Sequence, residues 1–278
     1  MIKLNKQIIL ETSVKKISEK ILKRNIFKGN IIIIEKCDEI LEIIKIAETH
    51  FSSFFDLSIN KFFNENSKGN VDNLRLFGIL QKRVKNCKLI KNKFSNFLSK
   101  IFLNTSSIYI DKIAMRYSPR KSDKTIGDLV PTRAHRDTWA SNIYNQINFW
   151  LPLHNVTEEN SIFIAPNYFA RKIANNSKTW SFRLYKKKKE YPSVPTSTNR
   201  IAGKDMIGFK LSKGQIICFS GHHLHGSMIG AKARINLETR IVSRGDEKKY
   251  DIPRNIDSMS RVKQNRWFKN IKTEEFFV

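Results

Sequence analysis

From about residue 107 the chain becomes a series of short alternating or apolar segments separated by Pro, Gly, Asn and Ser. These segments are SIYIDKIAMRYS, NQINFWLPL, NSIFIAP, GQIICFSG and ARINLETRIV. All seven prolines lie at or beyond position 119, and eight of the eleven glycines lie beyond position 120. A period of two between turn residues is typical of antiparallel strands, so this part of the chain predicts a β-sandwich or barrel.

The first hundred residues contain few helix breakers and space their apolar residues as helices do. The two clearest stretches are DEILEIIKIAETHFSSFF (38–55) and ILQKRVKNCKLIKNKFSNFLSKIFL (79–103). We expect amphipathic helices that pack on a neighbouring sheet. The prediction is therefore one α+β domain over all 278 residues, with a mainly helical part (1–106), a mainly β core (107–245) and a C-terminal extension (246–278).

The formal net charge of +26 suggests nucleic acid or an anionic surface as a partner. The excess is spread along the whole chain, however, and Lys, Asn and Ile are abundant together, so a purely compositional origin is the alternative. One segment departs from the average, because residues 170–205 hold ten Lys/Arg against only Glu190 and Asp205. This segment fits the strand pattern poorly and reads as a long insertion between strands. If this segment lies near the mouth of an active site, its positive charge would favour an anionic substrate. The alternative is that its lysines are simply exposed to solvent.

The cysteines and the apolar runs bear on location. Cys37, Cys87 and Cys218 are widely spaced and form no CxxC pair, which argues against a disulfide framework and favours a reducing cytoplasm. The N-terminal segment MIKLNKQIILETSVKK reads as neither a signal peptide nor a membrane span. The run IIII at 31–34 is also far shorter than the roughly 20 apolar residues of a transmembrane helix.

Two histidine-bearing motifs indicate a metal site. In a strand, residues i and i+2 project to the same side, so His135 and Asp137 of RAHRDTW can aim an imidazole and a carboxylate at one point. The second motif, CFSGHHLHGS, follows an apolar strand and offers a further imidazole. We favour His225, which precedes the small residues Gly226 and Ser227, with His223 in reserve and His222 on the other side of the strand. Two histidines and one carboxylate form the facial triad of non-haem Fe(II) oxygenases.

The strand RINLETR supplies candidate anchors for an anionic cosubstrate. Alternation gives Arg234, Asn236, Glu238 and Arg240 one face. A buried arginine requires an anionic partner, and the distal carboxylate of 2-oxoglutarate suits its bidentate fork. A structural pair between Arg234 and Glu238 is the alternative.

With these motifs the chain resembles the phytanoyl-CoA dioxygenase-like family of Fe(II)- and 2-oxoglutarate-dependent oxygenases. The resemblance covers roughly residues 107–245 and rests on HRDTW, QINFWLPL, EENSIFIAPNYF, HLHGS and ARINLETRIV. It implies a double-stranded β-helix (jelly roll), with the N-terminal helices packed on the sheet. It also implies a dioxygenase that uses O₂ and hydroxylates a small organic substrate with release of succinate and CO₂.

Carried over by position, His135, Asp137 and His225 would bind iron and Arg234 would bind 2-oxoglutarate, with Asn148 as a second polar contact. The gap from His225 to Arg234 is nine residues (234 minus 225), short for the family, which leaves Arg240 open as the anchor.

Further residues are candidates for the substrate pocket, and three other functions are alternatives. Trp139 could form an apolar wall of the substrate pocket, as could Trp150 unless it packs in the barrel, and Arg116 could lie in the pocket or on the surface. Arg234, Asn236 and Arg240 also resemble the pattern of alkylated-base demethylases. A nucleic-acid-binding module, with aromatics such as Phe62, Phe94 and Phe97 among lysines as a stacking groove, is the rival from another class. A zinc or manganese hydrolase with the same triad is the third reading.

Overall fold

The computed structural model describes residues 9–65, 71–121, 130–187 and 191–278, and for residues 64–65 and 71–75 it describes the backbone only. Two expectations fall partly outside this range. The first eight residues of the N-terminal segment and Lys188 and Lys189 of the basic insertion are not among the described residues. None of the helices in the described ranges has the length and apolar character that a bilayer crossing requires.

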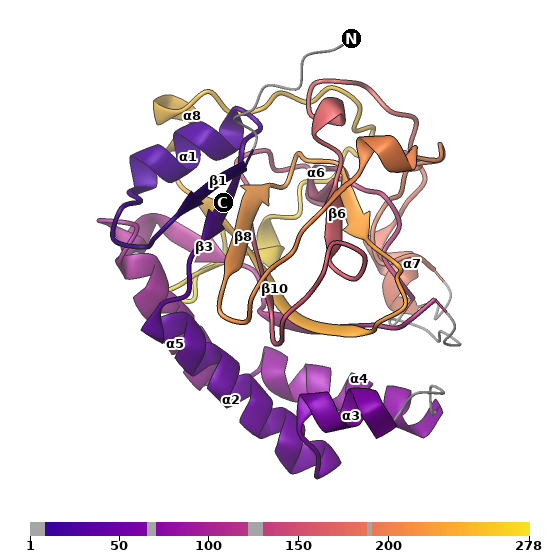
Figure 1. Ribbon diagram of the computed structural model, residues 1–278. Coiled ribbons are helices and arrows are strands. Elements are labelled where there is room, and N and C mark those ends of the chain that lie inside the picture. Colours follow the sequence, from indigo (N-terminus) through magenta and orange to yellow (C-terminus); the bar gives the residue numbers. More distant parts are fainter. Residues whose placement is uncertain (1–8, 66–70, 122–129, 188–190) are drawn as a thin grey trace.

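The fold is built around one large sheet (Figure 1). Its strands are antiparallel except for the parallel pair β1 and β2. In spatial order the strands are β1 (Ile9–Thr12), β2 (Ile31–Ile34), β8 (Ile216–Ser220), β5 (Ile147–Pro152), β10 (Arg234–Ser243), β3 (Ile108–Ile110) and β11 (Lys269–Asn270), and β4 (Ala114–Ser118) also pairs with β10. The strand segments expected from the period of two thus form strands, as predicted.

A smaller antiparallel sheet of β7 (Ile207–Gly208), β6 (Ile162–Ile164) and β9 (His225–Ser227) packs against the large one. The apolar layer between the two sheets contains side chains from β2, β5, β8 and β6, together with Phe209 and Leu211. The mixed α/β architecture with an antiparallel core therefore agrees with the expected fold class.

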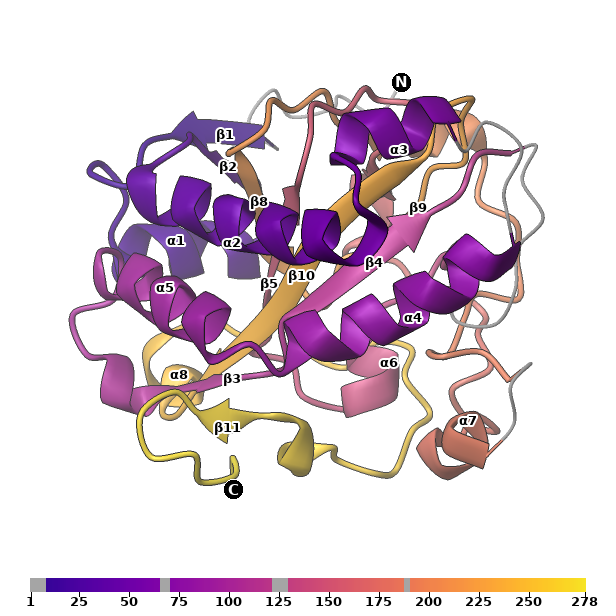
Figure 2. The same ribbon diagram turned by 90° about the horizontal axis from the view of Figure 1, so that it is seen from below.

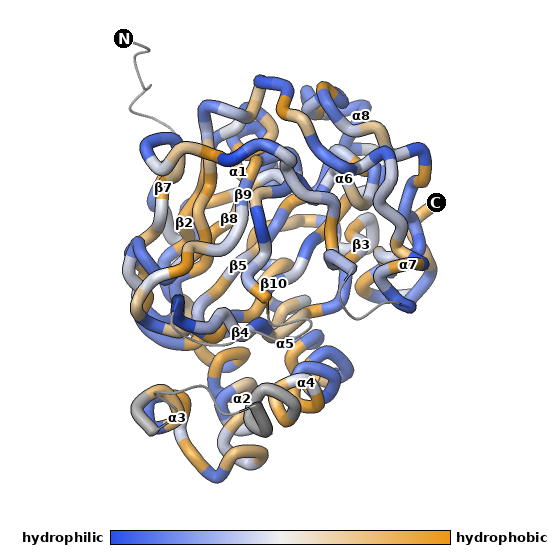
Figure 3. Tube along the Cα trace, turned by 90° about the vertical axis from the view of Figure 1, so that its right-hand side faces the viewer, coloured by the Kyte–Doolittle hydropathy of each residue, from blue (hydrophilic) through white to orange (hydrophobic). Residues whose placement is uncertain are grey.

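The IIII run forms the strand β2, in which every residue is apolar. Ile31 and Ile33 face the layer between the sheets, whereas Ile32 and Ile34 face the helices. All four are buried because both faces of this strand are covered. Figure 3 shows β2 and β8 as predominantly hydrophobic segments. The mainly helical N-terminal part thus also contributes β1 and β2 to the large sheet.

Helices cover the outer face of the large sheet, as Figure 2 shows from the helical side. Their bounds are α1 (Glu19–Phe27), α2 (Asp38–Phe55), α3 (Ile59–Glu65), α4 (Val71–Lys85) and α5 (Lys88–Ser99). On α2, Ile40, Ile43, Ile44, Ala47 and Phe51 are buried at helical spacing, and Asp38 and Glu39 begin the helix where its dipole favours negative charge.

The apolar pattern over 79–103 corresponds to two helices rather than one. Helix α4 ends at Lys85, and Cys87 takes an extended conformation as the N-cap of α5. Asn86 and Cys87 are weak helix formers, which accounts for the break. Phe62, Phe94 and Phe97, considered above as a nucleic-acid stacking groove, are buried in the core and do not form such a groove.

The remaining helices are short: α6 (Asp137–Ser141), α7 (Phe182–Lys187) and α8 (Asp246–Lys249). The C-terminal extension, expected as irregular structure or a short helix, contains α8 and also adds the edge strand β11 beside β3. Its Phe277 packs on Tyr109 with a ring separation of 5.2 Å. The extension therefore belongs to the folded body of the protein.

A buried ion pair joins α1 to the end of β10. The Lys23 side chain is fully buried, and its Nζ lies 2.7 Å from Asp246 Oδ1 and 2.6 Å from Glu19 Oε1. The ammonium also lies over the rings of Phe102 and Tyr250. A buried charge without its partner is costly, so this pair fixes α1 against α8.

We predict that Asp246→Asn lowers the free energy of unfolding by about 3 kcal/mol, because it leaves Lys23 with less compensation for its buried charge. Urea denaturation at neutral pH measures this loss. Glu247→Gln, an exposed change on the same helix, serves as the control. A loss below about 1 kcal/mol in Asp246→Asn would contradict the prediction.

Candidate metal centre

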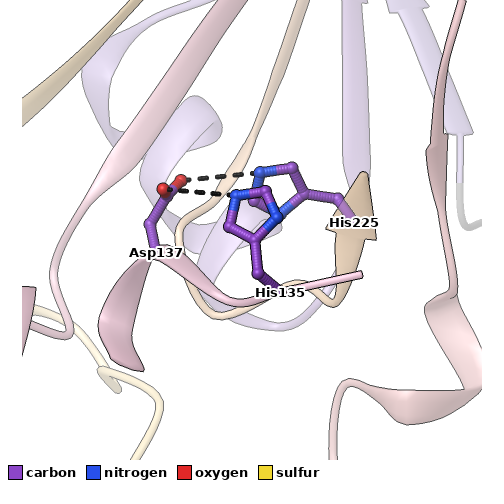
Figure 4. Close-up of side chains that lie close together, drawn as sticks. All are labelled: His135, Asp137 and His225. Carbon is purple, nitrogen blue, oxygen red and sulfur yellow. Dashed lines mark ion pairs between the residues drawn. The ribbon is translucent and has the colours of Figure 1, made fainter. Parts of the chain in front are cut away.

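His135, Asp137 and His225 converge in the structure, as Figure 4 shows. The Nε2 atom of His135 lies 3.8 Å from Asp137 Oδ1, and that of His225 lies 3.6 Å from Asp137 Oδ2. One ligand atom from each residue lies within 4.8 Å of the others. Within the described ranges this is the only group of three or more His, Cys, Asp or Glu side chains so arranged. The arrangement can hold one metal ion.

The backbone brings the two motifs together through an antiparallel bridge. The amide of His135 donates to the carbonyl of His225 at 2.8 Å, and the amide of His225 donates back at 2.9 Å. Asp137 is not on a strand, as the alternation argument assumed, but is the first residue of α6. The two side chains still meet, because the chain turns from an extended segment into the helix between them.

Hydrogen bonds orient both imidazoles. Nδ1 of His135 lies 2.8 Å from the carbonyl of Arg133, and Nδ1 of His225 lies 3.0 Å from the carbonyl of His223. A carbonyl can only accept, so in the neutral form of each imidazole Nδ1 carries the proton and Nε2 keeps its lone pair. Both lone pairs belong to the atoms nearest Asp137, which is the arrangement a metal ion requires.

The Asp137 carboxylate is held in its charged form. Burial by itself would raise its pKa, but the nearby Arg240 favours the anion and the pKa is lowered to about 2. Arg240 Nη1 lies 3.2 Å from Oδ1, and Asn148 Nδ2 donates to Oδ2 at 2.5 Å. Arg240 is in turn paired with Asp111. Asp137 therefore presents an anionic carboxylate in a fixed orientation.

Burial and the neighbouring His135 lower the pKa of His225 to about 4, so its imidazole is neutral at physiological pH. The short distance between His225 and Asp137 is then not an ion pair. It is a spacing that would suit two ligands of one metal ion.

The other two histidines of CFSGHHLHGS lie elsewhere. His223 Nδ1 lies 3.2 Å from the Ser220 carbonyl and its Nε2 lies 3.0 Å from the Gly29 carbonyl, and His222 packs edge-on against Phe169. A Cβ atom at Gly226 would lie 2.9 Å from the carbonyl oxygen of Thr132. The structure therefore brings His225, the favoured candidate, to Asp137, and a small residue is required directly after it.

A cavity of about 160 Å³ opens beside the three ligands. Its wall includes Arg234, Glu238 and Arg240 from β10, together with Asn148 and Trp150 from β5. The intervening residues of β10, Ile235, Leu237 and Ile241, face the helices in the opposite core. Thr239, which alternation places with these three residues, lines the cavity instead, so the predicted division of this strand into two faces is confirmed except at Thr239.

Arg234 is buried with neutral partners only. Its guanidinium donates to the carbonyls of Ser161 (2.7 Å) and Asn160 (3.2 Å) and to the Ser227 hydroxyl (3.1 Å). It makes no ion pair with any carboxylate among the described residues, and Glu238 pairs with Arg116 instead at 2.8 Å. The alternative of an Arg234–Glu238 pair is therefore wrong. Burial lowers the pKa of Arg234 to about 10, because the charge of Glu238, which makes no ion pair with it, offsets the cost of burial only in part.

The remaining candidates divide between the cavity and the core. Arg116 and Trp150 line the cavity, and the guanidinium carbon of Arg234 lies 5.6 Å from the centre of the Trp150 ring. Asn236 is fully buried beside Arg234, and its Oδ1 accepts from Nε at 3.3 Å. Trp139, expected as a pocket wall, is fully buried beneath the site, and its indole N–H donates to Asp257 at 2.7 Å.

Sequence reasoning missed three residues of the surroundings: Asp111, Arg136 and Asp257. Arg136 stands inside the quoted HRD triplet, so its position was a usable signal. Asp111 and Asp257 lie in segments without a motif. Two residues of the basic insertion, Ser193 and Val194, line the cavity.

We predict that Asn148→Leu weakens divalent metal binding about tenfold, because it removes a hydrogen bond that orients the Asp137 carboxylate. Anaerobic calorimetric titration with Fe(II) measures the change. Asn145→Leu is the matched control, since Asn145 is also buried but donates to the Ser243 carbonyl, away from the ligands. Equal affinities for Asn148→Leu and the wild type would refute the prediction.

No protein-family model and no curated protein matches this sequence. Among solved structures, the chain is similar to EvdO2 from Micromonospora carbonacea var. aurantiaca complexed with 2-oxoglutarate (11% identity, 82% of this chain and 91% of that one, TM-score 0.45). It is also similar to the epimerase SnoN in complex with Fe³⁺, α-ketoglutarate and nogalamycin RO (12% identity, 80% and 82%, TM-score 0.43). A third is the non-heme monooxygenase ThoJ (10% identity, 75% and 71%, TM-score 0.38). At such values the likeness assigns neither an activity nor a substrate to the chain.

Proposed function

We propose that this protein is a non-haem Fe(II) oxygenase that uses 2-oxoglutarate as its cosubstrate. One observation carries the proposal: the ligands His135, Asp137 and His225 face a cavity whose wall also holds Arg234, a buried cation without a carboxylate partner among the described residues. The first feature suits a metal ion, and the second suits a dicarboxylate beside it.

The donor set favours iron over other metals. Two imidazoles and one carboxylate leave coordination positions open, and this combination is the one that non-haem Fe(II) oxygenases use. When bound, iron supplies the activation of O₂ and the oxidising power of the reaction. We further propose that the two facing sheets form a double-stranded β-helix, and that the whole chain is one domain because β2 pairs with β8. The free thiols Cys37, Cys87 and Cys218 fit the expected cytoplasmic location.

Arg234 rather than Arg240 is the proposed anchor for 2-oxoglutarate. Arg240 already faces two carboxylates, Asp111 and Asp137, so its charge is compensated. Arg234 has only neutral oxygens around it, and Asn236 holds its Nε in place. Asn148 also lines the cavity beside the proposed ligands, where its amide N–H₂ donates to Asp137.

The chain's own residues bind, orient and exclude water. Asn148 and Arg240 fix the Asp137 carboxylate, while Trp150, Phe219 and Ile162 give the cavity an apolar wall. Such a wall keeps water from the reacting groups. Hydroxylation of a small organic molecule, with release of succinate and CO₂, is the proposed outcome.

We predict that the anaerobic protein develops a weak visible charge-transfer band on addition of Fe(II) and 2-oxoglutarate, and that Asp137→Ala abolishes it. Arg234→Met should raise the 2-oxoglutarate concentration for half-saturation by at least about thirtyfold, since losing one partner of a buried charge pair costs about 2 kcal/mol or more. Absorption titration measures both effects.

Arg240→Met is the matched comparison and should change the 2-oxoglutarate requirement less than Arg234→Met does. In air, the wild type should convert 2-oxoglutarate to succinate slowly without substrate. A wild-type protein that binds zinc but shows neither band nor succinate would instead support a hydrolase with the same triad.

We also propose that the substrate carries a negative charge. Lys112 and Arg116 line the cavity, and partial burial together with the charges of Lys112 and Lys186 lowers the pKa of Lys85 nearby. Arg116 is matched by Glu238, whereas Lys112 makes no ion pair with a described residue. A cavity edge with excess positive charge attracts anions.

We predict that small carboxylates stimulate succinate formation more than the amides of the same skeletons do. Lys112→Gln should raise the concentration of a stimulating carboxylate for half-maximal effect about two- to fivefold, as expected for a partly solvated ion pair. Lys20→Gln on α1 is the control. Equal responses to carboxylates and amides, or no change in Lys112→Gln, would remove the anionic class.

A further inference from the structure

Arg136, the residue between the ligands His135 and Asp137, points away from the cavity and is fully buried. Its guanidinium donates to the backbone carbonyls of His222, of Tyr168 (2.6 Å) and of Arg171 (2.9 Å). One side chain thus joins the segment of two ligands to the loop that leads to the third, and to the turn after β6.

The counter-ion of this guanidinium comes from the C-terminal extension. Asp257 Oδ2 accepts from Arg136 Nε at 3.2 Å, and its Oδ1 accepts from the indole N–H of Trp139 at 2.7 Å. The Asp257 carboxylate also accepts from the amide of Ile173, and Asn175 donates to its backbone carbonyl. Asp257 therefore holds residues on both sides of Asp137, one position before it and two after it.

We propose that Arg136 and Asp257 are positioning residues that set the spacing of the three ligands before a metal ion binds. The inference rests on the proposed metal centre, and it makes metal affinity depend on the C-terminal extension, about 120 residues along the chain from the HRD triplet (257 minus 136).

The partners that Arg136 and Asp257 contact support this positioning role. Neither residue lines the cavity, so neither touches a substrate there. Arg136 binds carbonyls on both sides of the site, in the His222 loop and around Tyr168 and Arg171, so its removal would free the two halves to move relative to each other. Loss of Asp257 would leave a fully buried guanidinium uncompensated, and relaxation of that charge would pull His135 and Asp137 with it.

Titration with Co(II) alone, followed by its visible ligand-field absorption, tests the proposal without turnover. Asp257→Asn should bind Co(II) about ten- to a hundredfold more weakly than the wild type, the range for residues that orient ligands. The absorption of the bound Co(II) should also change in shape, because the ligands settle at a different spacing. Trp139→Phe removes only one donor to Asp257 and should weaken binding about threefold.

Asp246→Asn is the matched control, because it breaks a buried ion pair remote from the ligands and lowers stability without touching their surroundings. It should bind Co(II) as the wild type does, with an unchanged spectrum. Wild-type affinity and spectrum in both Asp257→Asn and Trp139→Phe would overturn the positioning role, and so would equal weakening in Asp246→Asn. If Asp257→Asn does not fold, Trp139→Phe alone decides. A wild type that binds no Co(II) would overturn the metal centre itself.

Discussion

The backbone bridge between His135 and His225 is the contact on which the rest of the site depends. It joins two segments 90 residues apart in sequence (225 minus 135) and sets the two ring centroids 4.2 Å apart. His225 belongs to β9, which pairs with β6 in the small sheet, so the bridge attaches the His135 segment to that sheet. The separation of the two imidazoles is therefore set by backbone pairing.

Most charged side chains around this bridge are compensated by a partner of opposite charge. Asp137 is compensated by Arg240, Arg240 by Asp111, Arg116 by Glu238 and Arg136 by Asp257. Such a chain of pairs keeps buried charges tolerable, because each would be costly alone. Arg234 is the member without an anionic partner among the described residues, and this exception is what gives the cavity a chemical preference.

Local patterns predicted the strands and the ligands well, because both depend on short-range regularities. The period of two placed β5, β8 and β10, and the spacing in HRD together with the small residues after His225 identified the triad. The division of β10 into two faces followed from alternation alone.

What failed depended on contacts between distant segments. Trp139 looks like a pocket residue beside HRD, yet Asp257 and Ile173 bury it. Asn148 lines the cavity, and its contact with Asp137 was not indicated by the sequence. No local pattern announces Asp111 or Asp257, since a single carboxylate acquires its role only when the fold brings a guanidinium to it. The break at Cys87 was missed because the apolar spacing continues across it.

The basic insertion has two kinds of contact with the site. Its Ser193 and Val194 line the cavity, whereas Arg171 and Ile173 bind Arg136 and Asp257 through their backbone. Sequence changes around 193–194 would therefore alter the shape of the cavity, while changes around 171–173 would also disturb the support of His135 and Asp137.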